Sequence, residues 1–172
     1  ERLELKLASH GRKVHKFGRP TPEIEGLVAG TRLSPLITCS LDTGDRGLIS
    51  TFVERWHKET SSFHLPIREM TITLYDVASL FHLPVMGALQ TYEVLDVDEA
   101  IALLVELLEV TPDQAAAETK QCHGAYVRLS WLRDLYAERC DQMQWMVAAR
   151  AYLLHLVGYT IFANKSATHI GV

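Results

Sequence analysis

The segment FVERWHKETSSFHLPIREMTITLYDVASLF, residues 52–81, holds the side chains of this chain most suited to chemistry. Glu54 and His57 form a Glu-x-x-His pair, and on a helix this spacing places two metal ligands one turn apart, as in di-iron carboxylate bundles. Such centres need two copies of the motif and further inward carboxylates, whereas this sequence has one copy. We therefore interpret the pair as a solvated helix edge and expect no metal there.

A hydrolytic acid–base group is the second kind of chemistry that this segment could support. His57, His64 and Glu69 are residue types that transfer protons in such sites. No nucleophile accompanies them, because the sequence has no Gly-x-Ser-x-Gly motif and no cysteine in a recognisable catalytic motif. We expect the charged residues of the segment to pair across a helix–hairpin junction and to set its geometry. They are Glu54, Arg55, Glu59 and Arg68.

Two further candidate sites lack the residue pattern that their chemistry requires. Cys122 and His123 are adjacent, and neighbouring side chains rarely point the same way, so neither a triad nor a zinc site follows. The segment DTGDRG, residues 42–47, lacks the Gly-Lys-Ser/Thr ending and the preceding strand of a phosphate-binding loop. The residues therefore favour no catalytic site, no cofactor and no small-molecule substrate.

Arg150 is the most informative single charge, since it lies in the apolar run from Met146 to Ala163. A buried guanidinium must find carboxylate or carbonyl partners. We predict that Arg150 bonds a neighbouring helix or loop and fixes their relative placement; the alternative is an anion site. The run is also the only membrane candidate, but Arg150 and His155 interrupt it, so we interpret it as a buried helix.

The composition is that of an ordinary globular domain. The chain has 172 residues, of which 48% are hydrophobic and 22% charged, enough to bury a core within one domain. Cys39, Cys122 and Cys140 are odd in number and widely spaced, which indicates unpaired thiols in a reducing compartment. The net charge of −4 argues against a protein that binds nucleic acid over its whole surface.

Charge is unevenly distributed along the chain. Residues 1–19 contain six Lys or Arg and two Glu, a net charge of +4, so the remainder must carry −8 to give the total of −4. A basic leader on an acidic body could be a nuclear-targeting or nucleic-acid-binding arm. The simpler interpretation, which we favour, is a solvated tail.

Hydrophobic periodicity predicts a mainly α fold with five to six helices and one small β-hairpin after the first core helix. Residues 1–35, broken by Gly and Pro, are expected to form an irregular basic lead-in. The apolar face Leu48 to Trp56 predicts the first helix, with Asp45 as its N-cap, and the hairpin spans Phe63 to Ile72. The later helices are expected at residues 73–83, within 96–120 with a restart at Thr111, at 130–143 and at about 142–162.

Capping signals support three of these helices. Thr73 and Asp76 approximate a capping box, and Pro84 is expected to end that helix. Thr111-Pro112 with Gln114 gives an N-cap, a proline at the first helical position and a glutamine at the third. Ser130 is the expected cap of the next helix.

Three segments together resemble the plant mobile domain. LISTFVERWHKETSSFHLPIREMTITLYDVASLFHLPVMG, residues 48–87, resembles the opening signature of that family. VRLSWLRDLY resembles its middle helix, and AARAYLLHLVGYTIFANKSATHIGV resembles a later helix and the turn after it. The resemblance runs from about residue 36 to the end, so residues 36–172 are identified as the N-terminal part of such a domain. The signature residues are Glu54, Arg55, Trp56, Glu59, Phe63, His64, Leu65, Pro66, Thr71, Asp76, Pro84, Trp131, Arg150 and Lys165.

The sequence departs from the family pattern at four positions. His82 replaces a usual glycine and Met86 a usual acidic residue, while Arg68 stands where glycine is common and Asn164 where aspartate is common. These changes leave the fold intact but weaken the expectation of an interaction through the Leu-Pro-Val-x-Gly turn.

The resemblance implies an interaction domain and no enzyme. The family carries the label aminotransferase-like, but a pyridoxal phosphate enzyme needs a Schiff-base lysine, a phosphate cup and an acidic partner for the pyridine nitrogen, and we identify neither a cup nor such a partner. Members of the MAINTENANCE OF MERISTEMS-like family are nuclear proteins tied to meristem maintenance, genome stability and silencing of transposable elements. The resemblance therefore implies a nuclear location.

The resemblance also implies a protein partner. In phosphatase 7 long-form proteins the domain is joined to, or partnered with, a serine/threonine phosphatase domain, whose metal-binding motifs this sequence lacks. We expect a phosphatase-like or chromatin-associated nuclear partner, contacted by Phe63, Ile72, Leu83 and Val85. The alternative is a transposon-derived module that contacts nucleic acid through the basic leader. No membrane association is expected.

Overall fold

The computed structural model describes residues 17–38, 46–81, 95–162 and 168–171. In this part of the chain the fold is mainly α, as predicted, but the predicted count of five to six helices and one hairpin is wrong. The helices are α2 (Pro22–Gly30), α3 (Pro35–Thr38), α4 (Arg46–Val53), α5 (Leu74–Phe81), α6 (Val97–Leu108), α7 (Pro112–Gln121), α8 (Leu129–Asp141) and α9 (Trp145–Thr160). The strands are β1 (Trp56–His57), β2 (Ser62–His64), β3 (Glu69–Met70), β4 (Tyr126–Arg128) and β5 (His169–Gly171).

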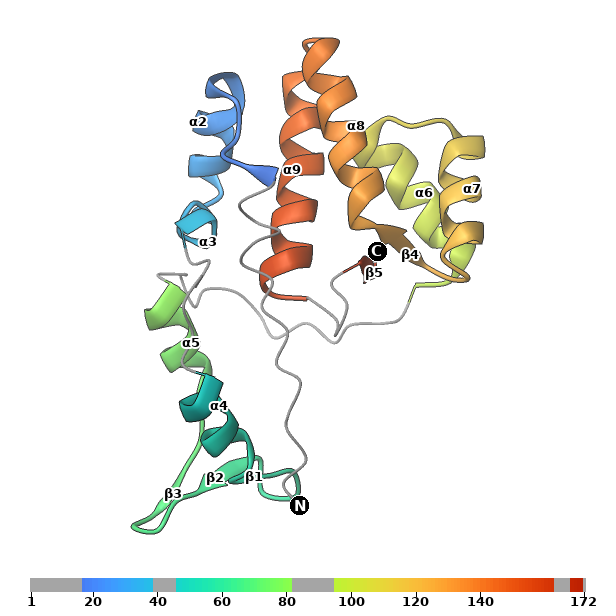
Figure 1. The fold of residues 1–172 in the computed structure, drawn as a ribbon. Helices are drawn as coiled ribbons and strands as arrows, with labels where there is room; N and C mark the ends of the chain where they lie inside the picture. The colour runs from blue at the N-terminus through green and yellow to red at the C-terminus, as the bar shows by residue number, and fades with distance from the viewer. Residues whose placement is uncertain (1–16, 39–45, 82–94, 163–167, 172) are drawn as a thin grey trace.

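Helix α9 is the centre of the helical body (Figure 1). It packs against α8, α2, α6 and α3. One core cluster, which includes Leu104, Leu132 and Ala151, fills the space between α6, α8 and α9. A second, which includes Ile24, Leu36 and Tyr152, joins α2 and α3 to the opposite side of α9. Because α9 is buried on several sides, its sequence is apolar nearly all round.

The expectation of an irregular segment before residue 36 is wrong for residues 22–30. Pro22 starts α2 at a position where proline is well tolerated. Ile24 and Val28, four residues apart, are buried against α9. The apolar pair on one face outweighs the poor helix propensity of Gly26, because tertiary packing overrides propensity.

Strands β4 and β5 form a second small sheet that the sequence did not predict. They pair antiparallel, with Val127 opposite Ile170, and the amide of Leu129 donates to the carbonyl of Thr168 at 2.9 Å. Helix α8 therefore begins at Leu129, directly after β4, and Arg128 occupies the cap position predicted for Ser130.

A close approach brings α9 onto this second sheet. A Cβ atom at Gly158 would lie 2.7 Å from Leu129 Cδ2 and 3.1 Å from Ile170 Cδ1. Both neighbours are buried side chains of the first core cluster. The glycine thus allows α9 to pack directly on the start of α8 and on β5.

The other elements form a separate projection, which we call the signature arm (residues 46–81). It contains α4, the three-stranded antiparallel sheet in the order β1-β2-β3, and α5. In Figure 1 the α4 and β1–β3 part of the arm extends below the helical body. The predicted hairpin is present as β2 and β3, but β1 adds a strand on its other side.

Helix α4 is shorter than predicted. It ends at Val53, and Trp56 lies in β1 opposite Phe63. Trp56 and Phe52 both pack against the ring of Phe63, with centroids 4.7 and 5.9 Å away in edge-to-face geometry, which is a favoured arrangement of aromatic pairs. Two of the expected boundary residues of the arm, Asp45 and Pro84, lie outside the described residues.

Candidate interaction site

The Glu-x-x-His pair does not occupy one helical turn. Helix α4 ends at Val53, before Glu54, and His57 lies on β1, so the interpretation as a helix edge is wrong. The ring of His57 stacks on that of His64 with centroids 3.8 Å apart. Within the described ranges no group of three or more His, Cys, Asp or Glu side chains is placed to hold a metal ion.

The pairing of β2 with β3 brings His64 and Glu69 together. Their register places them opposite each other, with Nε2 of His64 3.3 Å from Oε1 of Glu69. The His64 ring also lies 3.2 Å from the hydroxyl of Thr60. These contacts lie at a partly solvated surface, where they hold two strands in register.

The ion pairs expected across the helix–hairpin junction do not form. Among the described residues, ion pairs join His64 to Glu69, Arg128 to Glu118 and Arg133 to Asp134. None of these involves the four residues predicted to pair: Glu54, Arg55, Glu59 and Arg68. Backbone hydrogen bonds do the positioning instead, since His64 donates to the Arg55 carbonyl at 2.8 Å and Leu65 to that of Arg68 at 3.1 Å.

Other signature residues stabilise turns of the arm. The Thr71 hydroxyl donates to the carbonyl of Ser61 at 2.8 Å, beside a left-handed backbone at that serine (φ 49°). Asp76 accepts from the hydroxyl and amide of Thr73 at 2.6 and 2.8 Å, so the predicted capping box is confirmed. These hydrogen bonds from Thr73 hold the pKa of the Asp76 carboxyl below its ordinary value. Leu65 and Pro66 lie in the turn between β2 and β3.

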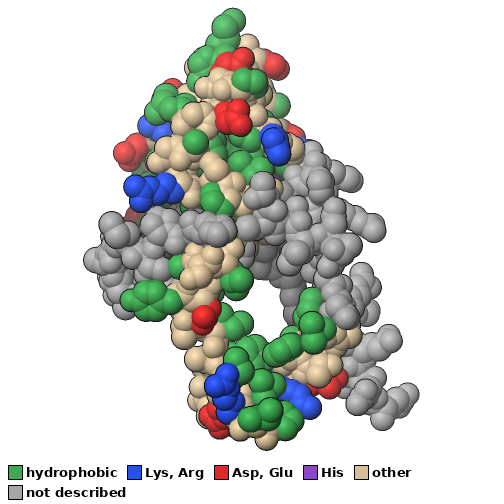
Figure 2. Space-filling model, turned by 90° about the vertical axis from the view of Figure 1, so that its left-hand side faces the viewer, with side chains coloured by type: hydrophobic (Ala, Val, Ile, Leu, Met, Phe, Trp, Pro, Cys, Tyr) green, Lys and Arg blue, Asp and Glu red, His purple; other side chains and the backbone are tan. Residues whose placement is uncertain are grey.

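The surface of the signature arm is rich in large apolar side chains. Ile67 is 94% exposed and Leu80 is 72% exposed. Figure 2 shows hydrophobic side chains over the lower end of the molecule. The exposed members of this set are Leu48, Ile49, Phe52, Val53, Trp56, Ile67, Met70, Ile72, Tyr75 and Leu80. Exposed apolar patches on a folded protein mark interaction surfaces.

The four residues expected to contact the partner differ in their surroundings. Ile72 is exposed between β3 and α5. Phe63 is instead half-buried inside the aromatic cluster of the arm, so it supports the surface from beneath. Leu83 and Val85 lie outside the described residues, as do Pro84 and Lys165.

Two guanidinium groups hold the C-terminal end of α6. Arg150 donates to the carbonyl of Leu107 at 3.2 Å, which confirms the predicted bond to a neighbouring helix. Arg139 donates to the carbonyl of Glu109 at 2.9 Å. The helix ends at Glu109 in a left-handed conformation (φ 50°), and cations are favourable where helix carbonyls lack partners. Sequence reasoning missed Arg139, because its partner is 30 residues away.

A buried carboxylate next to β4 was also missed. Glu118 accepts from the amide, Nε and Nη2 of Arg128 at 2.9, 2.9 and 2.6 Å, and from the Cys122 thiol at 3.6 Å. Burial raises the pKa of Glu118, but the hydrogen bonds from Arg128 outweigh that effect and hold it below its ordinary value. Burial and the negative Glu118 raise the pKa of Cys122 to about 11, so this free thiol is a poor nucleophile.

His155 is a buried histidine of α9. It is stacked on Phe17 with ring centroids 3.7 Å apart and lies 4.5 Å from the ring of Tyr159. Burial, together with the positive charge of Arg133, lowers the pKa of His155 to about 3. The imidazole is therefore neutral near pH 7, as a core residue would be. No helix among the described residues is long and apolar enough to cross a membrane.

Comparisons with known proteins identify the relatives of this chain. The plant mobile domain model matches residues 34–172. Protein MAIN-LIKE 1 of Arabidopsis thaliana is 36% identical over 131 residues, which cover 74% of this chain and 25% of that protein. Protein MAINTENANCE OF MERISTEMS of the same plant is 36% identical over 137 residues, with 74% and 26% covered.

A phosphatase-named protein shares the same segment. The Serine/threonine-protein phosphatase 7 long form homolog of Arabidopsis thaliana is 35% identical over 129 residues, which cover 71% of this chain and 9% of that protein. The chain thus spans about a quarter of the length of the first two relatives and under a tenth of the third. No solved structure matches it significantly. With residues 34–172 matched by the family model, the chain belongs to the plant mobile domain family.

Proposed function

We propose that this chain is a non-enzymatic nuclear interaction domain that binds a protein partner through the apolar surface of the signature arm. The observation that carries the proposal is the collection of ten large apolar side chains exposed on one projection of 36 residues, 46–81. A projection with this much apolar surface has a large hydrophobic gain from association.

The arm is also organised in advance of binding. The half-buried Phe63 ring supports the exposed rings of Phe52 and Trp56 from beneath, and the hydrogen bonds of Thr71 and Asp76 fix the strands and the start of α5. Its four Lys or Arg residues are balanced by four Asp or Glu residues, so recognition rests on apolar contact. A rigid apolar surface binds with less entropy loss than a flexible one.

A phosphatase 7 long-form-like protein is the proposed partner. One relative is named for that phosphatase and contains a segment 35% identical to this chain. Other relatives carry the names MAIN-LIKE and MAINTENANCE OF MERISTEMS, which supports a role in meristem maintenance. Action in the nucleus, in gene silencing of transposable elements, is part of the same proposal.

The proposal that the chain is not an enzyme rests on where its reactive groups lie. His64 lies on β2, where its ring forms an ion-pair contact with Glu69 on β3 and a hydrogen bond with the Thr60 hydroxyl. The Cys122 thiol has a pKa of about 11, and His155 is enclosed among aromatic rings. Phosphatase activity would then belong to a partner or to another domain.

The arm can be tested with one matched pair of variants. Leu80→Lys changes a 72% exposed residue of the arm, and Met143→Lys changes a 73% exposed residue between α8 and α9. Binding to the purified phosphatase domain of a phosphatase 7 long-form protein would be measured by calorimetry. We expect Leu80→Lys to weaken binding at least tenfold and Met143→Lys to leave it unchanged. Equal effects would overturn the arm as the docking surface, and absent binding would overturn this partner.

A second candidate function is contact with nucleic acid through the basic leader. The specific observation is the net charge of +4 over residues 1–19 against −8 for the rest. Removal of residues 1–16 is the suitable test, because it keeps Phe17, whose ring packs on His155. This function predicts DNA or RNA affinity that falls steeply with salt and is lost on truncation. Binding that is absent or independent of salt contradicts it.

A further inference from the structure

A pocket lies between α8 and the turn that joins α6 to α7, well away from the α4 and β1–β3 part of the signature arm (Figure 1). Its volume is about 130 Å³. An apolar cavity of roughly 150 Å³ accommodates a benzene molecule, so this pocket fits one planar group of similar size. Six side chains line it: Val110, Gln114, Trp131, Asp134, Leu135 and Glu138. We call it the indole pocket.

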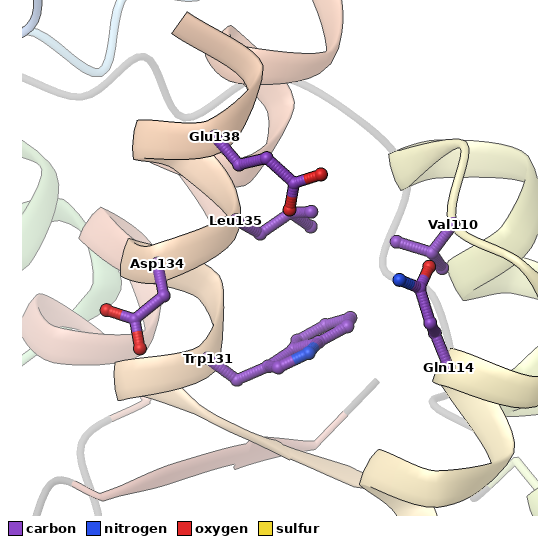
Figure 3. A pocket seen from close by; sticks show the side chains of 6 residues that line it. All are labelled: Val110, Gln114, Trp131, Asp134, Leu135 and Glu138. Atoms are coloured by element: carbon purple, nitrogen blue, oxygen red, sulfur yellow. The ribbon is translucent and has the colours of Figure 1, made fainter. Parts of the chain in front are cut away.

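An aromatic face and a carboxylate meet in the indole pocket. Figure 3 shows the Trp131 indole extending from α8 toward Gln114, with the Glu138 carboxylate farther along the same side of α8, beyond Leu135. Val110 lies on the facing side beside Gln114, and Leu135 lies on α8, so each side of the pocket has an apolar residue. Trp131 is half-buried and packs against the first core cluster, so the ring is held in place.

Glu138 has a carboxylate oxygen that is available to accept hydrogen bonds from a bound cation. Glu138 accepts one hydrogen bond from the Gln142 amide at 3.1 Å through Oε1, and its Oε2 atom takes part in no hydrogen bond with a described residue. Asp134 accepts from Arg133 through Oδ1 at the exposed rim. The nearby Arg139 is engaged by other partners: it donates to the carbonyls at the end of α6 and to two glutamine side chains.

The surroundings are acidic as well. Residues 95–145 contain ten Asp or Glu and four Lys or Arg, a net charge of −6. Arg128 is bonded to Glu118, and Arg139 to the end of α6. The resulting negative field attracts a basic segment before contact is made.

We propose that the indole pocket binds the guanidinium group of an arginine from a basic protein segment. Guanidinium is planar, stacks on indole and donates in a fork that matches a carboxylate, so Trp131 and Glu138 together fit it. A lysine ammonium is a compact, strongly hydrated charge that cannot stack in this way. The indole pocket is thus a second recognition site, chemically distinct from the apolar arm.

The probe is a capped pentapeptide, acetyl-Gly-Ala-Arg-Ala-Gly-amide, titrated into the whole 172-residue chain with ¹⁵N-labelled tryptophan. The chain has three tryptophans, and the Trp131→Phe variant assigns the indole signal of Trp131. We expect the Trp131 signal alone to shift with saturation, with a dissociation constant on the order of 1 mM, since one side chain supplies the affinity. The neutral isostere, with citrulline in place of arginine, is expected to give no shift.

Three results decide the proposal. Glu138→Gln, a surface change that leaves the core intact, should weaken peptide binding at least threefold, and the arm variant Leu80→Lys should leave it unchanged. Equal shifts with the citrulline or lysine peptide would overturn the assignment to guanidinium. If the Trp131 signal does not shift at a concentration of the arginine peptide tenfold above the expected dissociation constant, the site itself is overturned. Because the arm variants test a different surface, the two proposals can fail independently.

Discussion

Glu118 and Arg128 are joined through both carboxylate oxygens and three donors of the arginine, one of them its backbone amide. The carboxylate belongs to α7 and is only 2% exposed, while the arginine ends β4 and immediately precedes α8. A single ionic contact therefore fixes the direction in which the chain leaves α7 and enters α8. Because the carboxylate is buried, its charge depends on this partner.

Neutralising Glu118 is expected to destabilise the fold. Glu118→Gln keeps the side-chain shape but removes the charge, and we expect the free energy of unfolding in urea to fall by about 1–3 kcal/mol, less than for a fully buried pair because Arg128 is partly exposed. Asp134→Asn is the matched control, since it removes the carboxylate of the exposed Arg133–Asp134 pair. We expect Asp134→Asn to lower the free energy of unfolding by about 0–0.5 kcal/mol. Equal losses in the two variants would contradict the role of burial.

Alanine at two glycines should have opposite effects. Gly158→Ala places a methyl group 2.7 Å from the Leu129 side chain, so we expect the free energy of unfolding to fall by about 1–2 kcal/mol. Gly26 lies in α2 with nothing within 4 Å of an added Cβ, so Gly26→Ala should stabilise by about 0.5–1 kcal/mol through helix propensity. Thermal unfolding of both variants checks this. A stabilising Gly158→Ala would mean that α9 does not approach β5 closely.

Acid should weaken the fold through His155. Its pKa is about 3 in the folded chain against 6.5 for an ordinary histidine, so the unfolded chain takes up a proton that the folded chain excludes as the pH falls below about 6.5. Between pH 7 and pH 5 this linkage costs about 2 kcal/mol of stability. His155→Leu removes the titration, and urea unfolding at both pH values should show a smaller loss than in the parent chain. The same loss in both would contradict a buried neutral imidazole.

The Cys122 thiol should resist alkylation. Its pKa is about 11 against an ordinary 9.0, so at pH 8 it holds about a hundredfold less of the reactive thiolate. Iodoacetamide labelling followed by mass spectrometry of the Cys122 peptide should be slower by about that factor in the folded chain than in the chain unfolded by urea. Comparable rates in the two states would show that the thiol is neither shielded nor affected by Glu118.

Local signals in the sequence predicted the starts of α5 and α7. The capping boxes at Thr73 and Thr111 need only residues three positions apart, and both are present. That Arg150 bonds a neighbouring element was predictable, because a charge in an apolar helix requires a partner. Its acceptor, the Leu107 carbonyl, was not predictable, since nothing local specifies which helix lies opposite.

Long-range pairing accounts for what the sequence did not predict. Strand β5 exists because its residues meet the distant strand β4, and its own residues carry no periodic signal. The aromatic spacing of Phe52 and Trp56 suits one helix face, yet Trp56 pairs with Phe63 on a neighbouring strand. The apolar surface of the arm could not be foreseen, because the same side chains would form a core if another element covered them.

The central place of α9 has a consequence during synthesis. The Tyr152 hydroxyl donates to the carbonyl of Gly18, 134 positions earlier, and the Thr21 amide donates to the Tyr136 hydroxyl, 115 positions later. At roughly 5–20 residues per second, a ribosome leaves the apolar side chains of α2 without their partner helix for on the order of ten seconds. Contacts between residues this far apart in the chain slow folding. The nascent chain therefore passes through a period in which its N-terminal half is exposed to chaperones and to aggregation.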